Sequence, residues 1–222
     1  MKKSTVSKSG SMRRGIFFPG PSGSEKSKLV NLILADPMHS DRFGRAISHT
    51  SRKIRPGEVH GREYFFVSKQ EFETKIAEKG FAEFAKFGGE YYGTSCEQLD
   101  QLWTSGKAVI GDVNDVGARQ IRKLYPYVLF AFIWPTDVSV LAARLRERPG
   151  MTEKSILERT TIETPREMQA WHESCHLRIL SIDQRLDKLK ASADLVIAEY
   201  MKDPIGFLAY LNTDNLEDRT FS

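Results

Sequence analysis

Apolar runs alternate with helix-like segments along most of the chain. The runs cover residues 15–19, 109–113 and 128–134, and the segments that follow them, 26–35, 116–124 and 138–148, have a helical pattern. In the first of these segments Leu29, Leu32 and Ile33 share one face. A further strand at 194–198 and a helix at 204–211 continue the pattern. Because strands that alternate with helices form parallel sheets covered on both faces, we predict an α/β fold with a parallel sheet core.

The rhythm changes between residues 44 and 94, where short strand-like pieces surround a single helix. A capping box, Ser68 with Glu71, marks the start of that helix. We expect residues 44–94 to form an inserted mixed α+β lobe between two parts of the core, 14–43 and 95–212. Residues 148–163 are charged and have little apolar periodicity, which predicts a basic lid. The ends are polar, and we expect a flexible basic tail at 1–13 and a polar tail at 213–222.

Composition narrows the class of protein. The chain has 222 residues, enough for a core in one large domain, a formal charge of +4 and a pI near 9.0. Its arginines cluster near phosphate-type motifs, so we expect a small phosphorylated ligand and no nucleic-acid partner. Cys96 and Cys175 lack metal-type spacing, which favours reduced thiols in the cytoplasm. No apolar stretch approaches the ~20 residues that cross a bilayer, so no membrane partner is expected. Monomer and homodimer both remain open.

Residues 20–27, GPSGSEKS, lie between the first apolar run and the first helix, which is the setting of a phosphate-binding loop. In such a loop Lys26 would reach the β- and γ-phosphates of a nucleotide, and the Ser27 hydroxyl would hold Mg²⁺. Glu25 stands where the pattern G-x-x-x-x-G-K-[ST] has its second glycine. Its carboxylate must point outward or weaken nucleotide binding, because like charges repel. The expected cofactor-binding residues are Gly20, Pro21, Ser22, Gly23, Ser24, Glu25, Lys26 and Ser27.

Two segments of the lobe carry a family resemblance: SHTSRKIRPGEVHGREYFFV at 48–67 and FAEFAKFGGEYYGTS at 81–95. With the phosphate-binding loop and the RLRER segment, in this order, they make the chain resemble guanylate kinase from Arg14 to about Leu211. The resemblance implies a P-loop nucleoside monophosphate kinase that uses ATP and Mg²⁺ and accepts GMP. It implies that the lobe binds GMP through Ser48, Arg52, Arg55, Tyr64, Glu83, Tyr92 and Thr94.

The chemistry of these side chains suits the implied roles. Arg52 and Arg55 offer planar forks that match a phosphate, and the Tyr64 and Tyr92 hydroxyls can donate to the same oxygens. The Glu83 carboxylate can accept from guanine N1–H and N2–H together, which adenine cannot supply. Taken singly, the two arginines are equally well explained as solvated surface residues, so their interpretation depends on their ordered neighbours.

Asp112 falls at the end of the apolar run 109–113, a suitable place for an acidic residue that organises Mg²⁺ through water. In the resembling family a second aspartate follows two residues later in the GMP site, where this chain has Asn114. An amide keeps an acceptor but loses the charge, which leaves open an acceptor other than GMP. A realignment onto Asp115 would require the strand end to shift.

Three arginines, Arg144, Arg148 and Arg159, match those that the family brings over the transferring phosphoryl group. With Lys26 they are the expected catalytic residues, because phosphoryl transfer requires positive charge around the equatorial oxygens. Arg144 and Arg148 are four positions apart, and on spacing alone a solvent-facing charged stripe explains them as well.

Residues 172–176, HESCH, match the zinc-protease pattern H-E-x-x-H. No third ligand has a recognised spacing, so we interpret His172 and His176 as exposed helix histidines. The leading functional hypothesis is ATP-dependent conversion of GMP to GDP. The alternative, prompted by Glu25, Lys28 and Asn114, is a guanylate-kinase-like protein with weak or no turnover that acts as a nucleotide- or protein-binding module.

Overall fold

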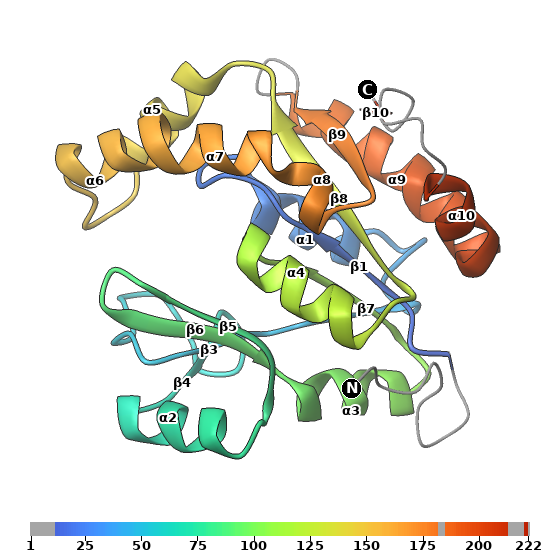
Figure 1. Ribbon diagram of the computed structural model, residues 1–222, viewed down its shortest axis with the longest axis horizontal. Coiled ribbons are helices and arrows are strands. Elements are labelled where there is room, and N and C mark those ends of the chain that lie inside the picture. The colour runs from blue at the N-terminus through green and yellow to red at the C-terminus, as the bar shows by residue number, and fades with distance from the viewer. Residues whose placement is uncertain (1–11, 182–184, 213–219, 222) are drawn as a thin grey trace.

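A parallel β-sheet forms the centre of the protein (Figure 1). The computed structural model describes residues 12–181, 185–212 and 220–221, so most of the two predicted tails lies outside it. Within this part of the chain six strands pair in the order β10-β9-β8-β1-β7-β2, and all neighbours are parallel. The strands are β1 (Gly15–Phe18), β2 (Phe43–Arg45), β7 (Ala108–Asp112), β8 (Val128–Pro135), β9 (Leu177–Ser181) and β10 (Thr220–Phe221). The prediction of an α/β fold with a parallel core is confirmed.

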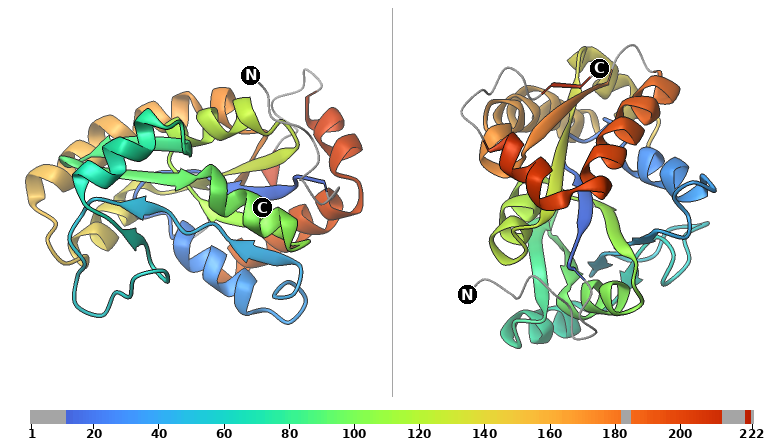
Figure 2. Two further views of the ribbon diagram at one scale, coloured as in Figure 1. Left: turned by 90° about the horizontal axis from the view of Figure 1, so that it is seen from below. Right: turned by 90° about the vertical axis from the view of Figure 1, so that its right-hand side faces the viewer.

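Helices cover both faces of this sheet because successive strand residues point to opposite sides. Ile16 and Phe18 pack with α1 (Lys26–Ala35), α9 (Leu186–Lys202) and α10 (Pro204–Leu211). Phe17 points the other way, into a cluster with α3 (Cys96–Thr104), α4 (Asp115–Leu124) and α8 (Trp171–Ser174). Figure 2 shows α1 and α4 on opposite sides of the sheet. None of the described helices is long and apolar enough to span a membrane.

The predicted mixed lobe projects from the core at the lower left of Figure 1. Its second sheet has the strand order β4-β3-β6-β5 and contains both parallel and antiparallel pairs. The lobe elements are β3 (His49–Thr50), β4 (Phe65–Phe66), α2 (Lys69–Ala77), β5 (Phe81–Phe87) and β6 (Glu90–Ser95). The predicted capping box is present at the start of α2, and Phe72 of this helix stacks on Phe81 with ring centroids 4.2 Å apart.

A helical arm faces the lobe across the molecule and contains the predicted lid (Figure 1). It consists of α5 (Val138–Arg146), α6 (Glu153–Glu158), a π-helical turn η1 (Arg159–Glu163) and α7 (Thr164–Gln169). Thr152 caps α6 by accepting a hydrogen bond from the Ser155 N–H. Residues 153–163 are therefore helical although their sequence shows little apolar periodicity.

Two parts of the predicted strand pattern are wrong. Residues 194–198, expected as a strand, belong to helix α9, and strand β9, which lies between β8 and β10, was missed. The apolar stretch Leu195–Ala198 resembles a buried strand, but Leu189, Ala193, Val196 and Ile197 are buried at helical spacing against the sheet. Packing of one apolar helix face therefore overrides the local β-propensity of valine and isoleucine.

Candidate active site

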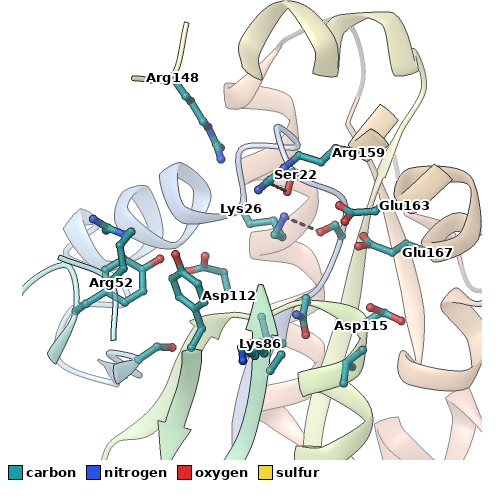
Figure 3. A pocket seen from close by; sticks show the side chains of 18 of the residues that line it. Ser22, Lys26, Arg52, Lys86, Asp112, Asp115, Arg148, Arg159, Glu163 and Glu167 are labelled. Carbon is teal, nitrogen blue, oxygen red and sulfur yellow. Dashed lines mark hydrogen bonds between the residues drawn. The ribbon is translucent and has the colours of Figure 1, made fainter. Parts of the chain in front are cut away.

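The carboxyl ends of β1 and β7 lie side by side, with Phe18 opposite Asp112. Ligands of open α/β sheets bind outside these ends, where loops leave the strands. A cavity of about 540 Å³ opens there and is lined by the phosphate-binding loop, the lobe, the start of α4 and the helical arm. Figure 3 shows Lys26 in this cavity, with Arg52 of the lobe on one side and Glu163 and Glu167 of the arm on the other.

The phosphate-binding loop turns from β1 into α1. Gly20 and Gly23 have φ of 151° and 93°, a region that favours glycine, and a Cβ at Gly20 would lie 2.8 Å from the Ile133 carbonyl oxygen. The buried Ser24 hydroxyl donates to the Pro21 carbonyl at 2.8 Å. Lys26 Nζ donates to the carbonyls of Gly20 at 2.6 Å and Pro21 at 2.7 Å, so it lies across the loop. Burial lowers the pKa of Lys26 to about 8.

Glu25 occupies the N-cap of α1 with left-handed backbone angles, φ 63° and ψ 19°. Its carboxylate accepts from Lys28 Nζ at 2.6 Å and pairs with Arg144 Nη2 at 3.1 Å. Among the described residues that line the cavity, neither Glu25 nor Arg144 is present. Glu25 thus tolerates the glycine-type backbone, and two cations outside the cavity compensate its charge.

Ser27 and Asp112 lie in contact at the mouth of the loop. The Ser27 hydroxyl donates to Asp112 Oδ2 at 2.7 Å, and Arg45 from β2 contacts Asp112 Oδ1 at 3.2 Å. Adjacent ligands of octahedral Mg²⁺ are roughly 2.9 Å apart at its normal coordination distance, so the two oxygens fit this cation. Arg45 was not anticipated from the sequence.

The lobe residues expected to bind a monophosphate meet on one wall of the cavity. Arg52, Arg55, Tyr64 and Tyr92 all line it, and the Tyr64 and Tyr92 rings meet edge to face at 5.9 Å. Arg52 is held by Glu58, with Nη2 2.7 Å from Oε1 and Nη1 3.0 Å from Oε2. Burial raises the pKa of Tyr64 to about 12, so its hydroxyl is a donor at neutral pH. Glu58, the counter-ion of Arg52, was not anticipated from the sequence.

A second group of lobe residues surrounds the buried carboxylate of Glu83, which is 6% exposed. Glu83 Oε1 accepts from the Thr94 hydroxyl at 2.8 Å, and Ser48 Oγ lies 3.1 Å from Thr94 Oγ1. Burial raises the pKa of Glu83 to about 7. The carboxylate reaches the start of α4, where a Cβ at Gly117 would lie 2.7 Å from Oε2.

Asn114 and Asp115 share the start of α4. Asn114 is the N-cap, and its side-chain oxygen accepts from the Gly117 N–H at 2.7 Å. Asp115, only weighed as an alternative from the sequence, is 5% exposed and pairs with Arg119 at 2.9 Å. Both line the cavity, so an acidic side chain lies next to position 114.

The three predicted catalytic arginines separate into two groups. Arg148 and Arg159 line the cavity, and Arg159 Nη1 donates to the Ser22 hydroxyl at 2.8 Å. Arg144 instead donates to the Gly23 carbonyl at 3.0 Å and pairs with Glu25. Arg144 therefore lies behind the phosphate-binding loop. It does not line the cavity, and with a side chain only 15% exposed it is not part of a solvent-facing stripe either.

Two acidic residues of the arm line the cavity and were not selected from the sequence, Glu163 and Glu167. Burial raises the pKa of Glu163, and it raises the pKa of Glu167 to about 7. Lys26 lies near enough to oppose part of the shift at Glu167. Arg159, Glu163 and Glu167 recur every four residues, a signal that would have indicated a shared helix face.

The H-E-x-x-H pattern does not form one helix face. Helix α8 ends at Ser174, Cys175 is extended, and His176 directly precedes β9. His176 is 3% exposed, and its Nδ1 accepts from the Phe130 N–H at 3.0 Å. The interpretation of His176 as an exposed helix histidine is therefore wrong, because its ring is buried and accepts a hydrogen bond from a backbone N–H of β8. The described His172 backbone belongs to α8.

Comparisons with known proteins agree with this geometry. A family model described as "Guanylate kinase" matches residues 12–196. Guanylate kinase of Synechocystis sp. is 39% identical over 155 residues, 70% of this chain and 79% of that protein. The Sus scrofa guanylate kinase is 33% identical over 189 residues, 85% of this chain and 94% of that protein. A crystal structure of guanylate kinase from Anaplasma phagocytophilum covers 91% of this chain and 90% of its own with a TM-score of 0.64 and 20% identity, which shows the shared fold.

The parallel core, the phosphate-binding loop and the inserted lobe define a P-loop nucleoside monophosphate kinase fold. The family match over most of the chain is more specific. The chain belongs to the guanylate kinase family.

Proposed function

We propose that this protein transfers the γ-phosphoryl group of ATP to GMP, giving ADP and GDP. The observation that carries the proposal is that one cavity is lined by both Lys26 of the phosphate-binding loop and the buried carboxylate of Glu83. The first suits a triphosphate and the second suits guanine, which presents two N–H donors on one edge.

The lobe would bind GMP through separate base and phosphate contacts. Glu83 accepts from the base, with the Thr94 hydroxyl fixing one of its oxygens. Arg52 and Arg55 bind the monophosphate, assisted by the tyrosine hydroxyls. Because the Arg52 guanidinium already pairs with Glu58, the monophosphate would either displace Glu58 or bind Arg52 together with it. The Asn114 side-chain oxygen is engaged as a helix cap, so its amide N–H₂ is left to donate to an acceptor on the base.

The donor nucleotide would lie over the loop at residues 20–27. ATP phosphates take the place of the Gly20 and Pro21 carbonyls as partners of Lys26 Nζ, and the loop amides approach the same oxygens. Ser27 and Asp112 would hold Mg²⁺, which neutralises charge on the β- and γ-oxygens when bound. This lysine stays protonated at neutral pH because its lowered pKa of about 8 is still above 7.

The transfer itself requires positioning and positive charge rather than a covalent intermediate. Arg148 and Arg159 come from the arm to the cavity, and Arg159 already contacts Ser22 of the donor loop. They would stabilise the equatorial oxygens of the transferring group and help exclude water when the arm closes on the lobe.

The alternative of a binding module with weak or no turnover was prompted by Glu25, Lys28 and Asn114, and Glu25 is the one of these beside the phosphate-binding loop that carries a negative charge. Its carboxylate pairs with Arg144 and Lys28 and is not part of the described cavity lining, so it places no uncompensated charge beside the phosphates. No observation favours this alternative over the kinase. We also predict action in the cytoplasm, in keeping with the two buried free thiols Cys96 and Cys175, and leave monomer and homodimer as alternatives.

The test is GDP formation by the purified full chain with ATP, Mg²⁺ and GMP, next to the same reaction with AMP. We expect turnover with GMP and at least about a hundredfold lower kcat/KM with AMP, because adenine cannot satisfy Glu83. Lys26→Met is the matched inactive variant. Absence of calorimetric GMP binding would remove the assignment of the lobe, whereas GMP binding without GDP formation would reject the kinase activity.

A further inference from the structure

The residue that departs from the phosphate-loop pattern, Glu25, belongs to a small charged cluster on the outer side of the loop. Its side chain is 13% exposed and that of Arg144 is 15% exposed, so the pair is largely shielded from water. Lys28, the third member, is 71% exposed. The buried partner of Glu25 is therefore Arg144, and Lys28 contacts the same carboxylate from the solvent side.

Arg144 contacts the loop at two residues, Gly23 and Glu25. One guanidinium nitrogen, Nη1, donates to the Gly23 carbonyl at 3.0 Å, and the other, Nη2, lies 3.1 Å from Glu25 Oε2. A planar guanidinium suits two acceptors in fixed directions, which a lysine ammonium does not reproduce. Glycine at position 25 would leave Arg144 with the single contact at Gly23.

Helix α5, which carries Arg144, is also in direct contact with the loop. At Gly23 a Cβ would lie 3.2 Å from the Leu141 carbonyl oxygen and 3.4 Å from Leu141 Cα, so the two backbones approach closely. Leu141 and Arg144 are three residues apart and share one face of α5. The helix therefore contacts the loop through both its backbone and its arginine.

The same helix leads into the lid that supplies the cavity arginines. Arg148 follows the end of α5 and lines the cavity, and Arg159 beyond α6 reaches the loop at Ser22. A displacement of α5 relative to the loop would move Arg148, and it would also move α6 and the turn that carries Arg159. Positional errors of this kind are costly in phosphoryl transfer, where catalysis depends on orientation.

We propose that Glu25 is a positioning residue that, through Arg144, anchors the base of the lid to the phosphate-binding loop. In this assignment Arg144 acts from behind the loop, and the glutamate that replaces glycine contributes to activity by holding Arg144 in place. The proposal rests on the proposed function for its kinetic readout. It also makes a claim about the free protein, namely that α5 and the lid are held more firmly with the Glu25 carboxylate than without it.

The kinetic test is a double-mutant cycle of Glu25→Gln, Arg144→Met and the double variant. Glutamine keeps the size of the side chain and removes the charge. We expect each single variant to lower kcat about tenfold through misplaced lid arginines, with KM for GMP changed less than about twofold because the lobe is untouched. The double variant should be no slower than the slower single variant, because one interaction is removed twice.

Arg146→Met is the matched control. Arg146 lies on the same helix, loses the same charge on substitution, and pairs with Glu153 at the surface, where the two side chains are 55% and 71% exposed. It should retain wild-type kcat. Losses in Glu25→Gln and Arg144→Met that multiply in the double variant would overturn the proposal, and so would a higher kcat in Glu25→Gln.

Amide hydrogen exchange of the free protein tests the anchor without turnover. Residues 138–163 should exchange faster in Glu25→Gln than in the wild type, and at the wild-type rate in Arg146→Met. If the wild type makes no GDP, the proposed function fails while this measurement still decides the anchor. Unchanged exchange in Glu25→Gln overturns the anchor even where the enzyme is active.

Discussion

Glu83 and Gly117 meet at the point where the lobe touches the core. The Glu83 carboxylate, fixed on one oxygen by Thr94, lies against the first turn of α4 so closely that a Cβ on Gly117 would be 2.7 Å from Oε2. The residue expected to read the base is thus supported from the lobe and limited in its freedom by the core. This arrangement makes the base contact sensitive to changes on either side.

Glu83→Gln should lower kcat/KM for GMP by about a hundredfold, because the amide presents one donor to a base edge that already carries two donors. KM for ATP should stay within about twofold, since the loop is untouched. Steady-state kinetics with each substrate varied in turn measure both effects. An unchanged kcat/KM for GMP would show that Glu83 does not contact the base.

Gly117→Ala should separate helix stability from base binding. Alanine is the better helix former by about 1 kcal/mol, so the free energy of unfolding should not fall by much. The new methyl group would displace the Glu83 carboxylate, and we expect KM for GMP to rise about tenfold. Urea unfolding measures the stability of the variant, and kinetics on the same preparation measure its KM for GMP. Gly106→Ala is unsuitable as a control, because alanine would be strained at the φ of 82° found there. Gly117→Ala with wild-type KM for GMP would contradict the close contact.

The pH dependence of GMP binding should follow Glu83. With a pKa of about 7, the carboxylate is mostly protonated at pH 6 and can no longer accept from both guanine donors, so GMP affinity falls as pH falls through 7. The loss should approach tenfold per pH unit below about pH 6. In Glu83→Gln only the titration of the GMP phosphate should remain, which calorimetry at several pH values can resolve. Free-protein stability has the opposite sign: burial favours the neutral acid, so this contribution is present below the ordinary pKa of 4.5 and is lost as pH rises through 7.

Arg159→Met should lower kcat by about a hundredfold or more, because it removes positive charge aimed at the transferring group. KM for GMP should change little, since the lobe contacts are separate. Arg146→Met provides the comparison, because Arg146 is an exposed arginine of the same helical arm and its ion pair with Glu153 is screened by solvent. Equal rates for the two variants would remove Arg159 from the catalytic machinery.

The sequence predicted best where local signals and packing agree. Helix α1 and helix α10 have the predicted bounds, and the capping box at Ser68 is present with both of its hydrogen bonds. The strand predicted at 194–198 failed because a β-branched run packs as one face of a long helix. Strand β9 was missed because the half-buried Arg178 interrupts its apolar pattern, and its guanidinium lies over the Trp134 ring at 4.8 Å.

In the site, as in the fold, local motifs could be found from the sequence, whereas contacts that depend on packing could not. Sequence motifs singled out Lys26, Arg52, Glu83 and Arg159, and these four side chains line one cavity. The direction of the Glu25 side chain was open from the sequence, because it depends on Arg144, a partner that only the packing of α5 on the loop brings near. Glu163 and Glu167 were not selected as site residues because charged helix residues are usually solvated, and only the fold turns these two toward the cavity.

His176→Leu tests whether the H-E-x-x-H pattern has a structural role. The substitution leaves the buried Phe130 N–H without its side-chain acceptor, and we expect the free energy of unfolding to fall by about 2 kcal/mol. Glu173→Gln, at an exposed position paired with Arg119 at 3.3 Å, would remove the base of a zinc protease but should leave stability unchanged within about 0.5 kcal/mol. Urea unfolding measures both variants, and metal analysis of the wild type should find no stoichiometric zinc. Stoichiometric zinc, or a chelator that destabilises the wild type but not His176→Leu, would instead make His176 a metal ligand.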